Sequence, residues 1–108
     1  MAIVDVTVIP IGTETPSVSK YVASIQKVLR NYEAEGKIKF QLTPMNTIME
    51  GELPVLFEAI QAIHELPFSE GIKRVATSIR IDDRRDVKRS MEYKVERVNS
   101  LVNENEDR

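Results

Sequence analysis

The chain has no cysteine and only one histidine, His64, among its 108 residues. The absence of cysteine excludes disulfides, thiolate metal ligands and cysteine nucleophiles, and a single histidine cannot form a paired-histidine metal motif. The four glycines are scattered, so the chain contains neither GxxxxGKS/T nor GxGxxG, and no serine lies in a nucleophile-elbow motif. With no such partner available, His64 is expected to be structural. These absences argue against an enzyme, a metal site and a resident cofactor.

A strong charge of either sign is also missing. Fifteen basic and 17 acidic residues give a net charge of -2, which provides no field to attract nucleic acid or an acidic membrane. Asp5 interrupts the first apolar stretch, no basic region precedes it, and no apolar run approaches the ~20 residues of a membrane span. We therefore expect a cytoplasmic protein without nucleic-acid or membrane partners.

The chain is close to the commonest domain size, so we expect a single domain over 1–108, with 103–108 as a frayed tail. Residues 2–11 alternate as a strand, and an amphipathic helix then begins at Thr15–Pro16 and stops at Gly36. Residues 37–43 and 46–50 are expected to form a hairpin. A helix over 54–65, a loop, a strand over 72–82 and a last helix capped by Asp83 or Asp86 follow.

This order of elements, β-α-β-β-α-β-α, predicts the ferredoxin-like α+β fold with an additional C-terminal helix. Right-handed crossovers place two helices on one face of a four-stranded antiparallel sheet. The last helix is expected to turn its apolar stripe inward: Val87, Met91, Val95, Val98 and Val102.

Alternation along the strands divides their residues between two faces of the sheet. The face covered by helices is expected to carry Val4, Val6, Val8, Ile38, Phe40, Leu42, Val75, Ile79 and Ile81. The opposite face is expected to carry Ile3, Asp5, Thr7, Ile9, Lys39, Gln41, Thr43, Thr47, Met49, Arg74, Ala76, Ser78 and Arg80. Three large apolar groups on this second face favour association of sheets from different subunits over a wet surface with scattered isoleucines.

The corner at residues 41–51, QLTPMNTIMEG, carries more chemistry than a turn requires. It offers two hydroxyls (Thr43, Thr47), an amide (Asn46), a carboxylate (Glu50) and soft thioether surface from methionine. A flat heteroaromatic ring needs such a mixture of apolar faces and a few edge contacts. The same residues are ordinary turn formers, so the pattern leaves both interpretations open.

The run RIDDRRDVKR at 80–89 has four arginines that suggest phosphate binding. Its three aspartates neutralise much of that field. A capped helix start with salt bridges is therefore the expected explanation.

Four segments together resemble the small thiamine-binding, YkoF-like protein family: VIPIGT, PSVSKYV, LTPMNTIMEG and RVATSIRIDDR. The resemblance runs from about Ile3 to Val98. It implies a ferredoxin-like subunit that assembles through its sheets into dimers and tetramers. It also implies a site for thiamine or its hydroxymethylpyrimidine moiety, with no assigned reaction.

The positions that match the family include Ser17, Ser19 and Tyr21 at the helix start and Thr77 and Arg80 in the last strand. Within the corner, the matching residues are Thr43, Met45, Thr47 and Glu50. Asn46 stands where the family motif frequently has glycine, and its side chain could narrow the pocket or add a contact. In this interpretation the hydroxyls of Thr43 and Thr47 hold the edge of the pyrimidine. The carboxylate of Glu50 accepts a hydrogen bond from the amino group of the ring or balances the positive charge of the thiazolium. Met45 and Tyr21 flank the rings.

Nothing in the sequence supplies a magnesium-diphosphate site, so free thiamine or hydroxymethylpyrimidine is expected as ligand. The leading hypothesis is an oligomeric, non-enzymatic carrier, sensor or scavenger. A second is an enzyme at an inter-subunit cleft with Glu50 as general base. A third is a regulatory module that binds a protein through a free sheet edge.

Overall fold

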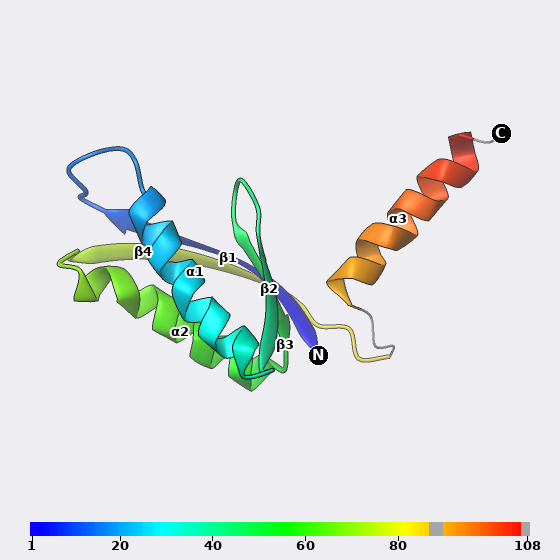
Figure 1. Ribbon diagram of the computed structural model, residues 1–108, viewed down its shortest axis with the longest axis horizontal. Coiled ribbons are helices and arrows are strands. Elements are labelled where there is room, and N and C mark those ends of the chain that lie inside the picture. Colours follow the sequence, from blue (N-terminus) through cyan, green and yellow to red (C-terminus); the bar gives the residue numbers. More distant parts are fainter. Residues whose placement is uncertain (87–89, 107–108) are drawn as a thin grey trace.

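The computed structural model describes residues 1–86 and 90–106, and its strands form one antiparallel sheet with the order β2-β3-β1-β4 (Figure 1). The strands are β1 (Ala2–Ile11), β2 (Ile38–Leu42), β3 (Thr47–Gly51) and β4 (Arg74–Asp82). The helices are α1 (Ser19–Ala34), α2 (Leu53–Ser69) and α3 (Met91–Glu106). This order and connectivity confirm the ferredoxin-like fold with an added C-terminal helix.

Helices α1 and α2 cover one face of the sheet, and the core lies between them and the strands (Figure 1). Val4 and Val6 from β1 meet Leu29 of α1 and Leu56 and Ile63 of α2, all of them fully or almost fully buried. Burying a side chain of this size stabilises the fold by about 1.5–3 kcal/mol each. The body of the molecule therefore has a complete core without α3.

Two helix boundaries differ from those predicted. Helix α1 begins at Ser19 rather than at Pro16, and its N-cap, Val18, makes no side-chain capping bond. Helix α2 continues to Ser69 through the segment expected to be a loop, with Pro67 inside the helix. Proline in a helix loses one backbone hydrogen bond, but the Pro67 ring is buried and the apolar contacts of this turn hold it in place.

The face assignment of β3 was wrong. Register pairs place Met49 opposite Val4 and Thr47 opposite Val6, and residues directly opposite in an antiparallel pair share a face. Thr47 and Met49 therefore lie on the helix-covered face, and Met49 is fully buried in the core. Ile48, opposite Asp5, supplies the apolar group that β3 adds to the other face, which we call the open face.

The inward orientation expected of α3 was also wrong. Val95, Val98 and Val102 are 61%, 58% and 47% exposed, and Figure 1 shows the helix projecting away from the body. The helix follows β4, an edge strand, and leaves beyond the end of the sheet, so α1 and α2 do not cover it. Val87 lies outside the described residues. The helix extends to Glu106, into the segment expected to fray.

Candidate functional site: a hollow behind the β2–β3 bend

The bend between β2 and β3 is closed by one threonine. The backbone N–H of Thr43 donates to the Asn46 carbonyl at 2.8 Å, and the N–H of Asn46 donates to the Thr43 hydroxyl oxygen at 3.0 Å. That hydroxyl lies 2.6 Å from Asn46 Oδ1, to which it donates. Thr43 and Asn46 are therefore largely engaged with each other, as turn chemistry predicts, whereas Met45 is 84% exposed at the tip.

Behind this bend is a hollow of about 210 Å³, beside the part of β1 that lies beyond its pairing with β3. It lies between the bend, the later half of β1 and the first turns of α1. Its lining is mostly apolar: Val6, Val8, Ile9, Val18, Val22, Ile25, Leu42, Pro44, Met45 and Ile63, with the polar residues Thr7, Gln26, Thr43, Asn46 and Thr47. None of these lining residues is charged.

Two polar side chains of this lining are buried and bonded to each other. Gln26 of α1 donates through Nε2 to the hydroxyl oxygen of Thr47 on β3, at 3.1 Å. Gln26 is 9% exposed and Thr47 is 6% exposed. A buried amide and hydroxyl beside an apolar wall can orient a small ring by its edge.

Gln26 was missed in the sequence analysis, although a signal was present. It lies four residues after Val22 and eight after Val18, within the stripe of α1 that faces the sheet. A polar residue in an apolar stripe needs a buried partner, and here that partner is Thr47.

Of the residues matched at the helix start, none lines the hollow. Ser17 lies two residues before α1, and Ser19 is the first residue of this helix. Both are exposed, and their hydroxyls lie 3.5 Å apart. Tyr21 is buried, and the Lys20 ammonium lies 5.2 Å from the centre of its ring. The cation-π contact at Tyr21 is therefore made within the chain.

The remaining predicted residues lie elsewhere on the sheet. The Thr77 hydroxyl is 2.7 Å from Nδ1 of His64, so this histidine has a polar partner within the chain. Arg80 donates to Asp5 at 2.7 Å on the open face. Glu50 is 2% exposed, also on the open face, and accepts a 3.4 Å bond from the N–H of Met91. The structure thus brings together Thr43, Met45, Asn46 and Thr47, but not Glu50, Thr77 or Arg80.

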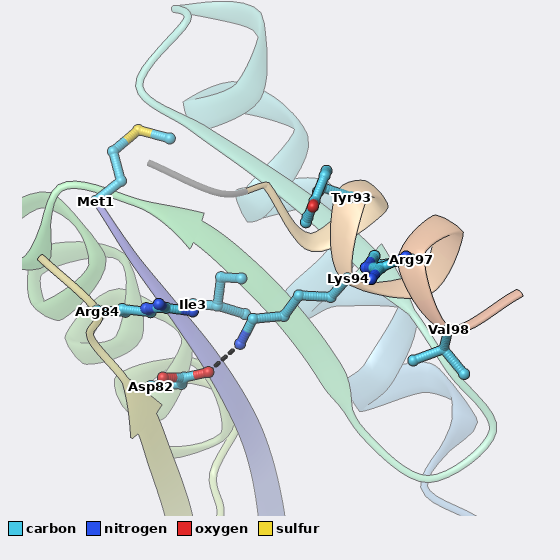
Figure 2. Close-up of a pocket in the computed structure, with 8 residues that line it drawn as sticks. All are labelled: Met1, Ile3, Asp82, Arg84, Tyr93, Lys94, Arg97 and Val98. Atoms are coloured by element: carbon cyan, nitrogen blue, oxygen red, sulfur yellow. Dashed lines mark hydrogen bonds and ion pairs between the residues drawn. The ribbon is translucent and has the colours of Figure 1, made fainter. Parts of the chain in front are cut away.

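A second hollow of about 480 Å³ lies where α3 leaves the sheet, and Figure 2 shows its lining. Lys94 reaches from α3 to an ion pair with Asp82 at the end of β4. Arg84 is paired with Asp86 at 2.6 Å. Lys94 and Arg84, two of the cationic side chains in this lining, already have carboxylate partners. The space is best explained as the gap between α3 and the open face.

The charged run that begins at Arg80 has the expected salt bridges, but neither Asp83 nor Asp86 caps the last helix, because α3 begins at Met91 and the Ser90 hydroxyl accepts from the N–H of Tyr93. Arg85 donates to Asp83 at 2.8 Å, in addition to the Arg84–Asp86 pair. The bonded guanidinium of Arg85 holds the pKa of Asp83 below its usual value. Arg89 lies outside the described residues.

The described part of the chain lacks two further kinds of feature, a metal cluster and a membrane-spanning helix. No cluster of three or more histidine, cysteine or acidic side chains there could hold a metal ion. No helix within residues 1–86 and 90–106 has the length and apolar character needed to cross a bilayer.

The family of the chain follows from comparison with known proteins. A family model described as thiamine-binding protein matches residues 4–99, which is most of the chain. The chain belongs to the thiamine-binding protein family. The resemblance inferred from the four sequence segments is therefore confirmed.

Two relatives span nearly the same length as this chain. The UPF0045 protein YqgV of Bacillus subtilis is 71% identical over 99 residues, which cover 92% of this chain and 95% of the relative. A UPF0045 protein of Methanothermobacter thermautotrophicus is 38% identical over 103 residues, covering 94% of this chain and 100% of the relative. The match therefore extends over the whole folded body.

Solved structures agree with the fold. The protein MJ1052 from Methanocaldococcus jannaschii is 30% identical and superposes with a TM-score of 0.80, covering 91% of this chain and 95% of that one. A Thermotoga maritima protein whose name refers to thiamine biosynthesis or salvage gives a TM-score of 0.70 at 18% identity, covering 90% and 97%. At that identity the similarity shows the fold alone.

Proposed function

We propose that this protein binds the aminopyrimidine ring of thiamine, or free hydroxymethylpyrimidine, in the hollow behind the β2–β3 bend. It acts as a non-enzymatic carrier, sensor or scavenger and needs no cofactor. The observation that carries the proposal is the buried Gln26–Thr47 pair in an otherwise apolar hollow. Membership of the thiamine-binding family supports the choice of ligand.

The size and charge of the hollow favour one part of the ligand. Pockets that enclose a drug-sized molecule have about 300–1,000 Å³, so a hollow of about 210 Å³ suits a single substituted ring. The thiazolium of thiamine would then lie at the mouth, near the exposed Met45. No cation lines the hollow to neutralise a diphosphate, which favours the unphosphorylated ligands.

Glu50 is not part of this proposed site, because it does not line the hollow and lies on the open face of the sheet. Its neighbour on that face is the start of α3, through the N–H of Met91. An enzyme that uses Glu50 as general base on a ring in the hollow is therefore not favoured by the geometry.

We further propose that the protein self-associates through the open face. Ile3, Ile9 and Ile48 place apolar surface there, and Ile9 is about half exposed. The neighbouring pair Asp5–Arg80 supplies polar groups around this surface, as in an interface with an apolar centre and a polar rim. Sedimentation showing only the 12.3 kDa monomer at micromolar concentration would contradict association.

Titration calorimetry tests the ligand. Thiamine and hydroxymethylpyrimidine are expected to release heat, whereas thiamine diphosphate should bind no better than thiamine, with or without magnesium. Heat only from the diphosphate in the presence of magnesium would contradict the proposed site.

A matched pair of variants locates the binding. Thr47→Val removes the hydroxyl bonded to Gln26 in the hollow, whereas Thr77→Val removes a hydroxyl bonded to His64 on β4. Only Thr47→Val is expected to weaken thiamine, by about 1 kcal/mol, the typical contribution of one hydrogen bond. Equal losses in the two variants would place the ligand elsewhere.

A further inference from the structure

The Gln26–Thr47 pair has hydrogen-bonding capacity that the protein does not use. A glutamine amide has an acceptor oxygen and two N–H donors, and a hydroxyl has one donor and two acceptor positions. Their mutual bond uses one donor of Gln26 and one acceptor position of Thr47. The hydroxyl proton of Thr47 and the carbonyl oxygen of Gln26 have no partner within residues 1–86 and 90–106.

One of these unused groups, the carbonyl oxygen of Gln26, keeps some access to solvent. Throughout the described part of the chain, every side-chain nitrogen or oxygen that is fully shielded from solvent has a hydrogen-bond partner. The carbonyl oxygen of Gln26 has none and is therefore not fully shielded, and both residues line the hollow. A ring that enters the hollow thus lies against two residues with spare capacity, an acceptor on Gln26 and a donor on Thr47.

That arrangement is complementary to the 4-amino edge of a pyrimidine. The amino group donates to the oxygen of Gln26, and the adjacent ring nitrogen accepts from the hydroxyl of Thr47. Two such neighbouring bonds fix the orientation of the ring as well as its position.

The same two side chains can also present the inverse pattern. If the amide turns over, its oxygen accepts from the Thr47 hydroxyl and its NH₂ group faces the hollow. The hydroxyl then offers a lone pair to the ligand. This second arrangement is complementary to a 4-oxo pyrimidine, whose carbonyl accepts from Gln26 and whose ring N–H donates to Thr47.

We propose that Gln26 and Thr47 form a reversible edge-reading pair, so that the ligand class of this site includes 4-oxo as well as 4-amino pyrimidines. The proposal rests on the proposed function, because it uses the same hollow. Both ligands are bound in one pose, and the proton positions of the pair adapt to the edge. Shape and the apolar wall, rather than the amino group, then set the specificity.

Calorimetric titration with thiamine and with oxythiamine, its 4-oxo analogue, tests this inference. The wild-type chain is expected to bind the two with dissociation constants within about threefold of each other. Gln26→Glu replaces the reversible amide by a carboxylate, which only accepts, so it should repel the 4-oxo group and still accept from the amino group. The oxythiamine-to-thiamine ratio of dissociation constants should rise at least about tenfold in this variant.

A second variant separates this role from a structural one. Gln26→Met keeps the length of the side chain without its amide, and should weaken both ligands by a similar factor of about ten, close to the loss of one hydrogen bond. Circular dichroism and thermal unfolding check that each variant is folded. If Gln26→Glu does not fold, unchanged affinities in Gln26→Met are enough to overturn the inference.

The outcomes distinguish the two proposals. No heat from thiamine with the wild-type chain overturns the proposed function and, with it, this inference. If thiamine binds, the inference alone is overturned when the wild type rejects oxythiamine by more than about thirtyfold, or when Gln26→Glu keeps the wild-type ratio.

Discussion

Replacing Thr43 by valine should loosen the bend that closes the hollow. The Thr43 hydroxyl accepts from the N–H of Asn46 at 3.0 Å and donates to Asn46 Oδ1 at 2.6 Å, and valine keeps the shape without either bond. The hydroxyl also accepts a longer bond from the N–H of Met45, at 3.3 Å. The two shorter hydrogen bonds, at about 0.5–1.5 kcal/mol each, give a loss of about 1–3 kcal/mol in the free energy of unfolding. We expect the lower half of this range, because the bend is only partly buried.

Urea denaturation followed by circular dichroism measures this loss, with Thr7→Val as the matched control. Thr7 also lines the hollow and is partly buried, but its hydroxyl has no hydrogen bond within the described residues. Thr7→Val should therefore change the free energy of unfolding by less than about 0.5 kcal/mol. Equal losses in the two variants would refute the view that Thr43 organises the bend through its hydroxyl.

Three further predictions concern the two faces of the sheet and the exposed helix α3. In urea denaturation, Met49→Ala should lower the free energy of unfolding by about 2–5 kcal/mol, and Ile48→Ala should lower it clearly less. A larger loss in Ile48→Ala would contradict the register, which places Met49 in the core. Glu50→Ala should leave the thiamine dissociation constant unchanged in calorimetry, since Glu50 lies on the open face. An increase of more than about threefold in this constant would indicate that Glu50 contacts the ligand. Val98→Ser, on the exposed face of α3, should change the free energy of unfolding of the monomer by less than about 0.5 kcal/mol. A decrease above about 1 kcal/mol, measured at nanomolar protein, would show that α3 packs against the rest of the same chain.

The fold could be predicted from the sequence because its first strand is long and has valine at alternate positions, all on its buried face. Val4, Val6 and Val8 fix the buried face of β1 over ten residues. The five residues of β3 contain too little alternation to show by themselves which of them face the helices. That assignment depends on the length of the bend, which places Thr47 opposite Leu42 and thus on the same face of the sheet.

The position of α3 could not be derived from its pattern, since an apolar stripe shows that a helix face needs cover but not what covers it. Nor could the site be fully derived. The corner motif led to Thr43 and Thr47, but the partner of Thr47 comes from α1, 21 residues earlier in the chain. Strand alternation indicates that Glu50 and Thr47, three residues apart, face opposite sides of the sheet. Only the register shows that Thr47 lies on the helix-covered face and Glu50 on the open face.

The central position of β1 has a consequence for how the chain folds. The first strand to be synthesised lies between β3 and β4, and its pairing with β4 joins Ile3 to Asp82. The sheet therefore cannot close until most of the chain exists, and much of its pairing is between residues distant in sequence. In such topologies the chain loses much conformational entropy by closing long loops before the stabilising contacts form. We therefore expect refolding in about milliseconds to seconds rather than microseconds.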